Sequence, residues 1–184
     1  MKILTIKNKK EEKFLRQKTA GFDLLLLRDA KRRGEISELV KNMRETMAEA
    51  EGVGLSANQV GLNMRLFTAR VPSGPVKRDE NNKIIMPSAS LMKFYAIFNP
   101  EIIKFSKEKI EIEEGCLSVP GYYGLVERPE KITITGYDKN GKKLKIKAWG
   151  MLARVFQHEM DHLNGFLFIN RTKKIFKITD KNEN

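Results

Sequence analysis

The clearest helical pattern in the chain is the segment ISELVKNMRETMAEAEG, residues 36–52. Its apolar side chains recur at the spacing of one helix face. They are Ile36, Leu39, Val40, Met43, Met47 and Ala50. Ser37 is a suitable N-cap and Gly52 a suitable stop signal. The pattern predicts an amphipathic helix whose apolar stripe faces the core.

The middle of the chain favours β-strands. Short β-prone runs at residues 64–71, 94–98 and 110–114 are separated by turn residues. Residues 131–148 alternate between apolar and polar around a turn sequence at 138–141, which predicts a hairpin with one wet face. Residues 71–90, in contrast, contain three prolines, a cluster of charges and no periodicity. We expect a long mobile loop there.

A second helix is expected near the C-terminal end. It should begin near Trp149 and end at Asn164 and Gly165, a pair suited to a left-handed C-terminal cap. One face of this helix carries Met151, Val155, His158 and His162. Because this face combines apolar residues with histidines, we expect the helix to pack in the core and also to carry functional side chains.

Length and composition limit the class of protein. A chain of 184 residues with 41% hydrophobic content can form one domain but is short for two. We therefore expect one domain over residues 1–171 and a short basic tail over 172–184, partly disordered. Cys116 is the single cysteine, which excludes a disulfide-stapled secreted scaffold. The longest apolar run, residues 24–27, is too short for a membrane span, so we expect a cytoplasmic protein without membrane attachment.

The formal net charge of +12 is compatible with a polyanionic partner such as a nucleic acid, the ribosome or an acidic membrane. However, lysine, isoleucine and asparagine are abundant throughout, and the basic residues are mostly scattered. This distribution favours compositional bias over a dedicated polyanion site, and we expect no specific DNA partner.

The stretch QHEMDHLNGFLF, residues 157–168, contains a candidate metal site. His158 and His162 are the only histidines of the chain, and they stand one helical turn apart. Two imidazoles at this spacing can bind one ion from the same side, while Glu159 flanks them within reach of a metal-bound water. The alternative is a surface helix with two ordinary histidines. The spacing favours two metal ligands and a base.

The third ligand is not found downstream. In the HExxHxxGxxH pattern of metzincin proteases the last position is a histidine, but here it is Phe168, which cannot ligate. A thermolysin-like glutamate is disfavoured because only Asp180 and Glu183 follow. Upstream, Cys116 in EEGCLSVPG would complete a thiolate and two-imidazole set suited to zinc or ferrous iron. A lone cysteine can equally be a small buried hydrophobe, so both interpretations stay open.

Three segments, GVGLSANQVG at 52–61, EGCLSVP at 114–120 and QHEMDHLNG at 157–165, together resemble the three signature motifs of peptide deformylases. The resemblance covers roughly residues 36–171. It implies an α+β fold in which antiparallel β-sheets pack around a central helix that carries HExxH. It also implies a metal-dependent hydrolase that removes the N-formyl group from the N-terminal methionine of newly synthesised polypeptides and releases formate.

The resemblance also implies roles for individual residues. Glu159 would act as acid and base, while the Gln59 side-chain amide and the Leu117 backbone N–H would bind the formyl oxygen. The metal would be one divalent ion, Fe²⁺ in first place and Zn²⁺ as the alternative. Its ligands would be Cys116, His158 and His162. The substrate partners would be nascent formyl-Met polypeptides, and the positive charge is compatible with ribosome contact.

Residues of a substrate pocket are also predicted. The glycine-rich stretch favours a close approach of the backbone to the substrate, with Gly54 bonding the peptide main chain and Val53 beside it. Further pocket residues can line the methionine side chain, although a core position explains them equally well. They are Ile112, Met151 and Val155.

Glu114 and Arg128 flank the cysteine segment, and we predict that they pair and hold it in place. The first motif departs from the usual family pattern, with Ser56 and Asn58 where alanine and proline or threonine are common. Two other function classes are weighed against a deformylase. One is an HExxH metallopeptidase of relaxed specificity. The other is a basic ribosome- or nucleic-acid-associated protein with a structural metal, which lacks a fourth cysteine or histidine ligand.

Overall fold

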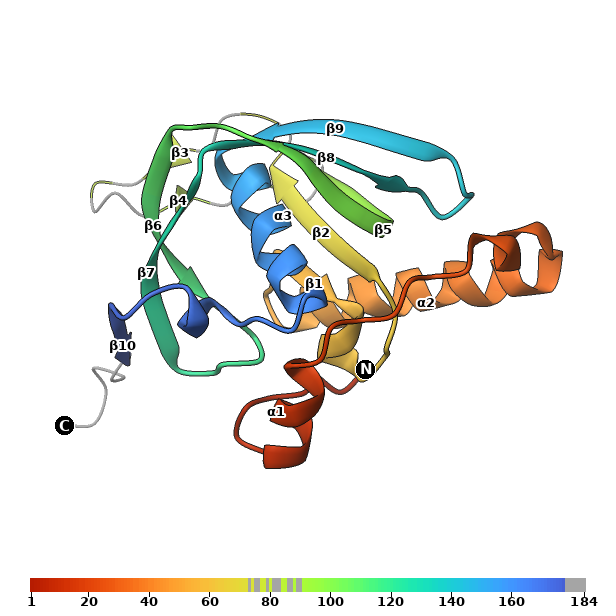
Figure 1. The fold of residues 1–184 in the computed structure, drawn as a ribbon, viewed down its shortest axis with the longest axis horizontal. Coiled ribbons are helices and arrows are strands. Elements are labelled where there is room, and N and C mark those ends of the chain that lie inside the picture. Colours follow the sequence, from red (N-terminus) through yellow and green to blue (C-terminus); the bar gives the residue numbers. More distant parts are fainter. Residues whose placement is uncertain are drawn as a thin grey trace.

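The computed structural model describes residues 1–72, 74, 77, 78, 80, 84, 85, 88 and 91–177. In this part of the chain, helix α3 (Gly150–Leu163) packs against strands of two antiparallel sheets (Figure 1). The larger sheet has the order β1-β2-β5-β8-β9 and the smaller one the order β10-β7-β6. The predicted α+β class with antiparallel sheets is confirmed.

The strands of the larger sheet are β1 (Gly54–Ser56), β2 (Leu66–Pro72), β5 (Met92–Phe105), β8 (Lys131–Tyr137) and β9 (Lys143–Trp149). The smaller sheet consists of β6 (Lys109–Gly115), β7 (Tyr122–Pro129) and β10 (Ile175–Lys177). A separate pair is formed by β3 (Lys77–Arg78) and β4 (Ile84–Ile85). The predicted runs at 64–71 and 110–114 correspond to β2 and β6.

Strand β5 is much longer than the predicted run at 94–98. It continues past Asn99, whose φ is 46°, and Pro100, and its register with β8 shifts between Phe98 and Glu101. Proline lacks the N–H that a regular ladder needs, and a bulge accommodates it. The Asn-Pro pair therefore looks like a strand end in the sequence but is an irregularity within one strand.

The predicted hairpin at 131–148 is confirmed as β8 and β9. Lys131 lies opposite Trp149 and Tyr137 opposite Lys143. The turn uses Gly141 at a φ of 77°, a conformation that glycine adopts without a steric penalty. Ile132 and Ile134 of β8 and Ala148 of β9 face the core, which leaves the alternate side chains of both strands on the outer face of the sheet.

The prediction for the first long helix was wrong at its start. Helix α2 runs over Ala30–Glu49, so it begins six residues before the predicted residue 36, and Ser37 lies inside it. The N-cap is Asp29, whose side chain accepts the N–H of Arg32 at 2.8 Å. The predicted apolar stripe does face the core, because Ile36, Val40, Met43 and Met47 are buried. The first turns are polar and therefore lack the apolar periodicity that would have revealed them.

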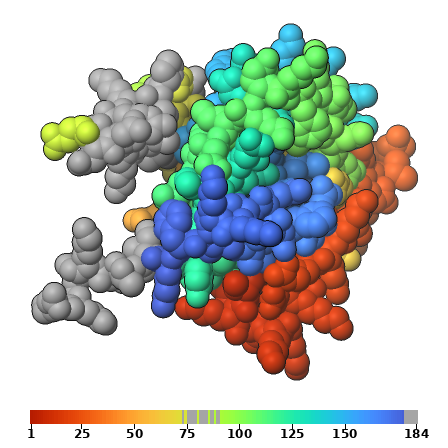
Figure 2. Space-filling view, turned by 60° about the vertical axis from the view of Figure 1, so that its left-hand side comes forward, coloured from red at the N-terminus to blue at the C-terminus, as the bar shows by residue number. Residues whose placement is uncertain are grey.

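Helix α3 ends as predicted. Asn164 is its C-cap, and Gly165 follows with a φ of 80°. A Cβ on Gly165 would lie 2.4 Å from the carbonyl oxygen of Arg16, so glycine is required by space as well as by conformation. The Thr19 N–H also donates to the Leu163 carbonyl at 2.9 Å. The N-terminal segment thus lies beside the end of α3, and the red and blue segments meet in Figure 2.

The described residues also form helices that the sequence pattern did not predict. These are α1 (Lys9–Leu15) and the short 3₁₀ helices η1 (Leu24–Arg28), η2 (Ala57–Val60) and η4 (Phe168–Asn170). The segment 71–90, predicted as a loop, contributes the end of β2 and the β3–β4 pair, while its other residues mostly lie outside the described part. Within the predicted tail, residues 175–177 form β10 against β7, and 178–184 lie outside the described residues.

Three buried apolar clusters hold the elements together. The first joins α3 to the inner face of the larger sheet, with Phe67 and Phe156 at a ring-centroid distance of 5.3 Å. The second lies between α2, β1 and β2, and the third lies under β7 and η4. Phe168 is 1% exposed, so it belongs to the core. None of the described helices is long and apolar enough to cross a membrane.

Candidate active site

The three predicted metal ligands meet where the cysteine segment touches α3. Cys116 follows the last residue of β6, and His158 and His162 lie one turn apart on α3. The Cys116 Sγ, and one ring nitrogen of each histidine, all lie within 4.8 Å of one another. The Sγ is 3.1 Å from the Nε2 of His162. A thiolate and two imidazoles converging in this way can hold a metal ion and leave a fourth position open.

Glu159, between the two histidines in sequence, is 2% exposed. Its Oε2 is buried without a hydrogen-bond partner among the described residues, and the same holds for the Nδ1 of His162. Burial raises the pKa of Glu159 to about 7, despite the opposing charge of His158. A carboxyl group with this pKa can accept and return a proton near neutral pH. Burial also lowers the pKa of His162 well below its ordinary value, which favours the neutral imidazole that metals bind.

Gly54 leaves the space that the Glu159 carboxylate occupies. A Cβ at Gly54 would lie 2.2 Å from the Glu159 Oε1 and 3.0 Å from the Cγ1 of Val155. The 2.2 Å distance is far below ordinary van der Waals contact, so any larger residue would displace the carboxylate. The structure thus gives Gly54 a packing reason of its own, in addition to the predicted contact with substrate.

Gln59 is 2% exposed and its amide orientation is fixed by Ser56. The Ser56 N–H donates to the Gln59 Oε1 at 2.9 Å, and the Ser56 hydroxyl oxygen lies 3.0 Å from the same atom. The Gln59 Nε2 consequently points to the cysteine segment, 3.1 Å from the Ser118 Oγ and 3.7 Å from the Cys116 Sγ. Leu117 lies between these two residues, and its N–H donates to no acceptor within the described residues.

Asn58 links the glutamine segment to α3. Its Nδ2 donates to the His162 carbonyl oxygen at 2.7 Å, and its Oδ1 accepts the Ser56 hydroxyl at 2.8 Å. Ser56 and Asn58 are the two departures from the usual family motif, and both are buried. In this chain the polar pair connects the segment that carries Gln59 with the helix that carries His162. The sequence marked these positions as unusual, but the partner on α3 is 104 residues away.

Glu114 lies on the inner side of β6 and binds three groups. Arg128 forms a bidentate pair with it at 2.6 and 2.9 Å, Arg154 donates at 2.8 Å, and the Nδ1 of His158 lies 2.9 Å from its Oε2. The predicted Glu114–Arg128 pair is thus present in the structure. Burial raises the pKa of Glu114, but the hydrogen bonds from Arg128 and His158 outweigh it and hold the pKa well below its ordinary value. A carboxylate on Nδ1 orients the His158 ring so that Nε2 is free for a metal.

Asp161 extends this buried network toward the C-terminal segment. Its carboxylate accepts hydrogen bonds from Arg128 at 2.8 Å and from Arg171. The sequence argument missed Asp161, Arg171 and Arg154. Arg154 and Asp161 lie on α3 itself, but a sequence pattern cannot tell which helix face meets a buried carboxylate on a distant strand.

The predicted pocket residues lie at the junction of both sheets with α3. Val155 is buried, and Val53 and Met151 are partly buried against the cluster that joins α3 to the larger sheet. Ile112 is half-buried on β6, two residues before Glu114 and therefore on the same face of the strand. These positions are compatible with both predicted explanations, a pocket and a core.

A cluster of one cysteine and two histidines, beside a buried glutamate on an α+β scaffold, defines a candidate metallohydrolase. A comparison with protein-family models matches residues 2–177 to "Polypeptide deformylase". The chain is 44% identical to a peptide deformylase of Halothermothrix orenii, over 74% of this chain and 77% of that protein. The chain therefore belongs to the polypeptide deformylase family.

Solved structures of peptide deformylases have a fold similar to that of this chain. A probable peptide deformylase of Synechococcus phage S-SSM7 is 37% identical, with a TM-score of 0.72 over 94% of this chain and 99% of that chain. A class I type b peptide deformylase from Acinetobacter baumannii, crystallised with Met-Ala-Ser, is 30% identical, with a TM-score of 0.75 over 92% and 96% of the two chains. Members of this family are metal-dependent enzymes that remove N-formyl groups, and the predicted class of enzyme is confirmed.

Proposed function

We propose that this protein removes the formyl group from the N-terminal formyl-methionine of newly synthesised polypeptides and releases formate. The observation that carries the proposal is the meeting of Cys116, His158 and His162 within 4.8 Å. Glu159 supplies the second part of the site, because it is buried and adjacent to His158 in the sequence. The family match over residues 2–177 supports the same reaction.

The donor set fits one divalent metal ion. Thiolate and imidazole ligands suit ferrous iron and zinc, and we propose Fe²⁺ as the native ion, with Zn²⁺ as the alternative. When bound, the ion would act as a Lewis acid and lower the pKa of a water molecule. The unpartnered buried atoms, Glu159 Oε2 and His162 Nδ1, lie on the same helix turn as these ligands.

Each residue of the site has its own role in the proposed reaction. Glu159 accepts the proton of the attacking water and later passes it to the departing amine nitrogen, which leaves as the new N-terminus. The Nε2 of Gln59 and the backbone N–H of Leu117 donate hydrogen bonds to the formyl oxygen as negative charge develops on it. Glu114 holds His158, and Arg128 and Arg154 hold Glu114.

The peptide substrate would run along β1. The Acinetobacter baumannii relative was crystallised with Met-Ala-Ser, a peptide that begins with methionine. For this chain we propose that Gly54 bonds the peptide main chain, with Val53 beside it. The methionine side chain would contact Ile112, Met151 and Val155. Of these residues, Val155 lies near Glu159, since a Cβ at Gly54 would meet both side chains.

The proposal also covers the cell compartment, the contact with the ribosome and the bounds of the domain. We place the reaction in the cytoplasm, where nascent chains carry the formyl group, and a positive charge of +12 would favour contact with the ribosome. Residues 1–171 would form one deformylase domain, with 172–184 as a short basic tail. Strand β10 adds part of this tail to the smaller sheet.

The proposal is tested by formate release. The protein is purified without oxygen, its metal content is measured, and formyl-Met-Ala-Ser and unformylated Met-Ala-Ser are offered separately. We expect formate from the first peptide and no cleavage of the second. Cleavage of the unformylated peptide would favour a metallopeptidase, and a metal-loaded protein that releases no formate would contradict the proposal.

Glu159→Gln isolates the role of the acid and base. We expect a loss of roughly 10² to 10⁴ in rate, because the amide cannot accept the proton, while metal content stays unchanged. Glu113→Gln is a matched control, since Glu113 is exposed on β6. Equal rates for the two variants would remove Glu159 from the reaction.

A further inference from the structure

The outer face of the larger sheet carries a group of exposed lysines. On β9, Lys143, Lys145 and Lys147 alternate with apolar residues that point into the core. Side chains two residues apart on a strand are separated by about 7 Å on one face, so the three form a straight row. Across β8 and β5 the sheet adds Lys131 and Lys104, and Trp149 ends β9. We call these six residues the basic sheet face.

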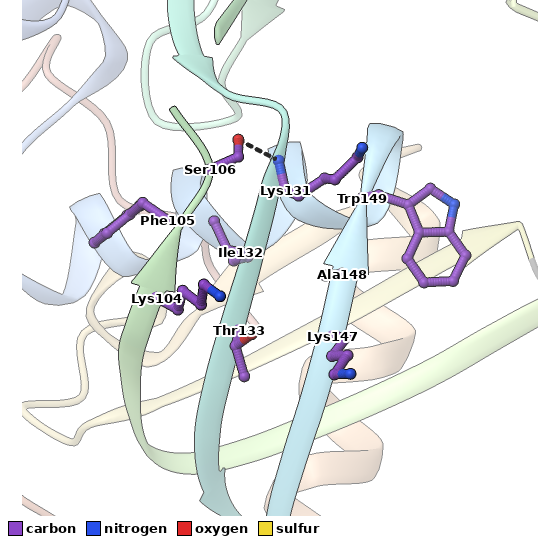
Figure 3. Close-up of a pocket in the computed structure, with 9 residues that line it drawn as sticks. All are labelled: Lys104, Phe105, Ser106, Lys131, Ile132, Thr133, Lys147, Ala148 and Trp149. Carbon is purple, nitrogen blue, oxygen red and sulfur yellow. Dashed lines mark hydrogen bonds between the residues drawn. The ribbon is translucent and has the colours of Figure 1, made fainter. Parts of the chain in front are cut away.

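A hollow of ≈ 410 Å³ lies at one end of this face. Figure 3 shows Lys104, Thr133 and Lys147 at the same level on three adjacent strands, in agreement with the pairing of Thr133 with both lysines. The lining also includes Phe105 and Trp149, and it is mainly apolar. None of its residues belongs to the Cys116, His158 and His162 site.

The lysines of the basic sheet face differ from Lys109 and Lys174 by their lack of close acidic partners among the described residues. Lys109 pairs with Glu127 at 3.0 Å and Lys174 with Glu111 at 2.7 Å, both on the smaller sheet. Within the described residues, in contrast, Lys131 of the basic sheet face makes only a 3.9 Å contact with Glu130. The other four, Lys104, Lys143, Lys145 and Lys147, make no ion pair with any described residue. The ammonium groups of these four lysines are therefore not neutralised within the described part of the fold.

Trp149 adds a flat apolar surface. Its side chain is 67% exposed, more than any other large hydrophobic residue in the described part of the chain. Aromatic rings beside a row of cations match a polymer that has flat bases and one negative charge per unit. The hollow favours such a strand over an anionic bilayer, because a flat membrane surface does not follow a concave surface.

We propose that the basic sheet face binds single-stranded nucleic acid, with phosphates on the lysines and a base stacked on Trp149. Binding does not depend on sequence, because lysines contact the backbone and every base has a flat face that can stack. The surface is separate from the deformylase site, so both can be occupied at once.

The test measures binding of a fluorescein-labelled oligoadenylate of about 12 nucleotides by anisotropy, at several salt concentrations. The first variant replaces Lys104, Lys131 and Lys147 with Gln. The control replaces three exposed lysines elsewhere, Lys10, Lys18 and Lys31, so that both variants lose the same charge. Formate release by each variant checks that it is folded.

We expect the sheet-face variant to bind roughly tenfold more weakly and the control less than about threefold. The dependence of log affinity on log salt should become shallower by about 2, since each phosphate contact contributes about 0.7 for a single strand. Trp149→Ala should weaken binding by roughly tenfold with little change in this slope, and Trp149→Phe should restore most of it.

Equal losses in the two lysine variants would show that net charge alone attracts the strand and would overturn the proposal. Absence of binding by the unmodified protein would also overturn it. A third arm uses vesicles of phosphatidylcholine and phosphatidylserine. Binding to these vesicles without binding to the oligonucleotide would assign the face to a membrane surface instead.

Discussion

Charged side chains are buried and paired around α3, whereas on the basic sheet face they are exposed and mostly unpaired. Around α3, Glu114 and Asp161 are buried, and each carboxylate binds at least two cationic side chains. On the basic sheet face, lysines are exposed and mostly unpaired. Buried charges need partners because desolvation is unfavourable, and the partners in turn fix their geometry. Exposed lysines fix little within the fold and act on other molecules at long range.

Glu159 is the informative exception in the first region. It is as buried as its neighbours, but its Oε2 has no partner among the described residues, and burial raises its pKa to about 7. The carboxylates of Glu114 and Asp161 are held by cationic side chains, whereas one oxygen of Glu159 lacks a partner in the described part of the chain, and we propose that this group transfers the proton. Separate effects on stability and on rate should therefore follow from substitutions in the same small volume.

The largest effect on stability is expected from Glu114→Ala. This change leaves Arg128 and Arg154 buried without their shared carboxylate, and the free energy of unfolding should fall by about 3 to 5 kcal/mol. Urea unfolding of the metal-free protein measures it. Glu113→Ala, on the exposed side of the same strand, should change the value by less than about 0.5 kcal/mol. Equal losses of unfolding free energy for both variants would mean that the buried ion pairs of Glu114 do not stabilise the fold.

The largest effect on rate outside Glu159 is expected from Gln59→Ala. Loss of one preorganised donor to the oxyanion should lower kcat/KM by at least about a hundredfold, which corresponds to at least about 2.7 kcal/mol. Formate release measures this loss. Ser118→Ala is the control, because it removes only the hydroxyl that the Gln59 Nε2 contacts at 3.1 Å. A near-normal rate for Gln59→Ala would remove this residue from the mechanism.

Gly54→Ala is expected to lower the rate of formate release. The new Cβ would displace the Glu159 carboxylate, and we expect a loss of about tenfold to a hundredfold in formate release because the base is misplaced. Gly34→Ala in α2 is the matched control. A Cβ there meets no atom within 4 Å, and the helix should gain about 0.5 to 1 kcal/mol. Full activity of Gly54→Ala would contradict the packing role assigned to this glycine.

The smallest effect is expected on the basic sheet face. Replacing Lys104, Lys131 and Lys147 with Gln should change the free energy of unfolding by less than about 0.5 kcal/mol, because these side chains are exposed and hold no buried partner. Urea unfolding again measures it. A loss comparable to that of Glu114→Ala would show that the lysines support the fold. The two regions would then not differ in their contribution to stability.

The local part of the site could be predicted from the sequence, and the long-range part could not. His158, Glu159 and His162 are fixed relative to one another by helical spacing, and Cys116 was the remaining soft ligand. Arg154 contacts Glu114 across 40 residues, and the pairing depends on how α3 lies against β6. No periodicity contains that information.

The same distinction applies to the fold. The hairpin of β8 and β9 was predicted because its alternation and turn are local, and the end of α3 because Asn164 and Gly165 form a recognisable C-terminal cap. The first turns of α2 were missed because they are polar and depend on the cap at Asp29. The lysines appeared scattered along the sequence, since only the sheet register brings Lys104, from β5, level with Lys147 of β9.

The central claim is that Cys116, His158 and His162 bind one metal ion together. X-ray absorption on the zinc-loaded protein tests it most directly. We expect one sulfur at about 2.3 Å and two imidazole nitrogens at about 2.0 to 2.1 Å, with the sulfur signal lost in Cys116→Ala. A metal-loaded protein whose spectrum shows no sulfur neighbour would contradict the account.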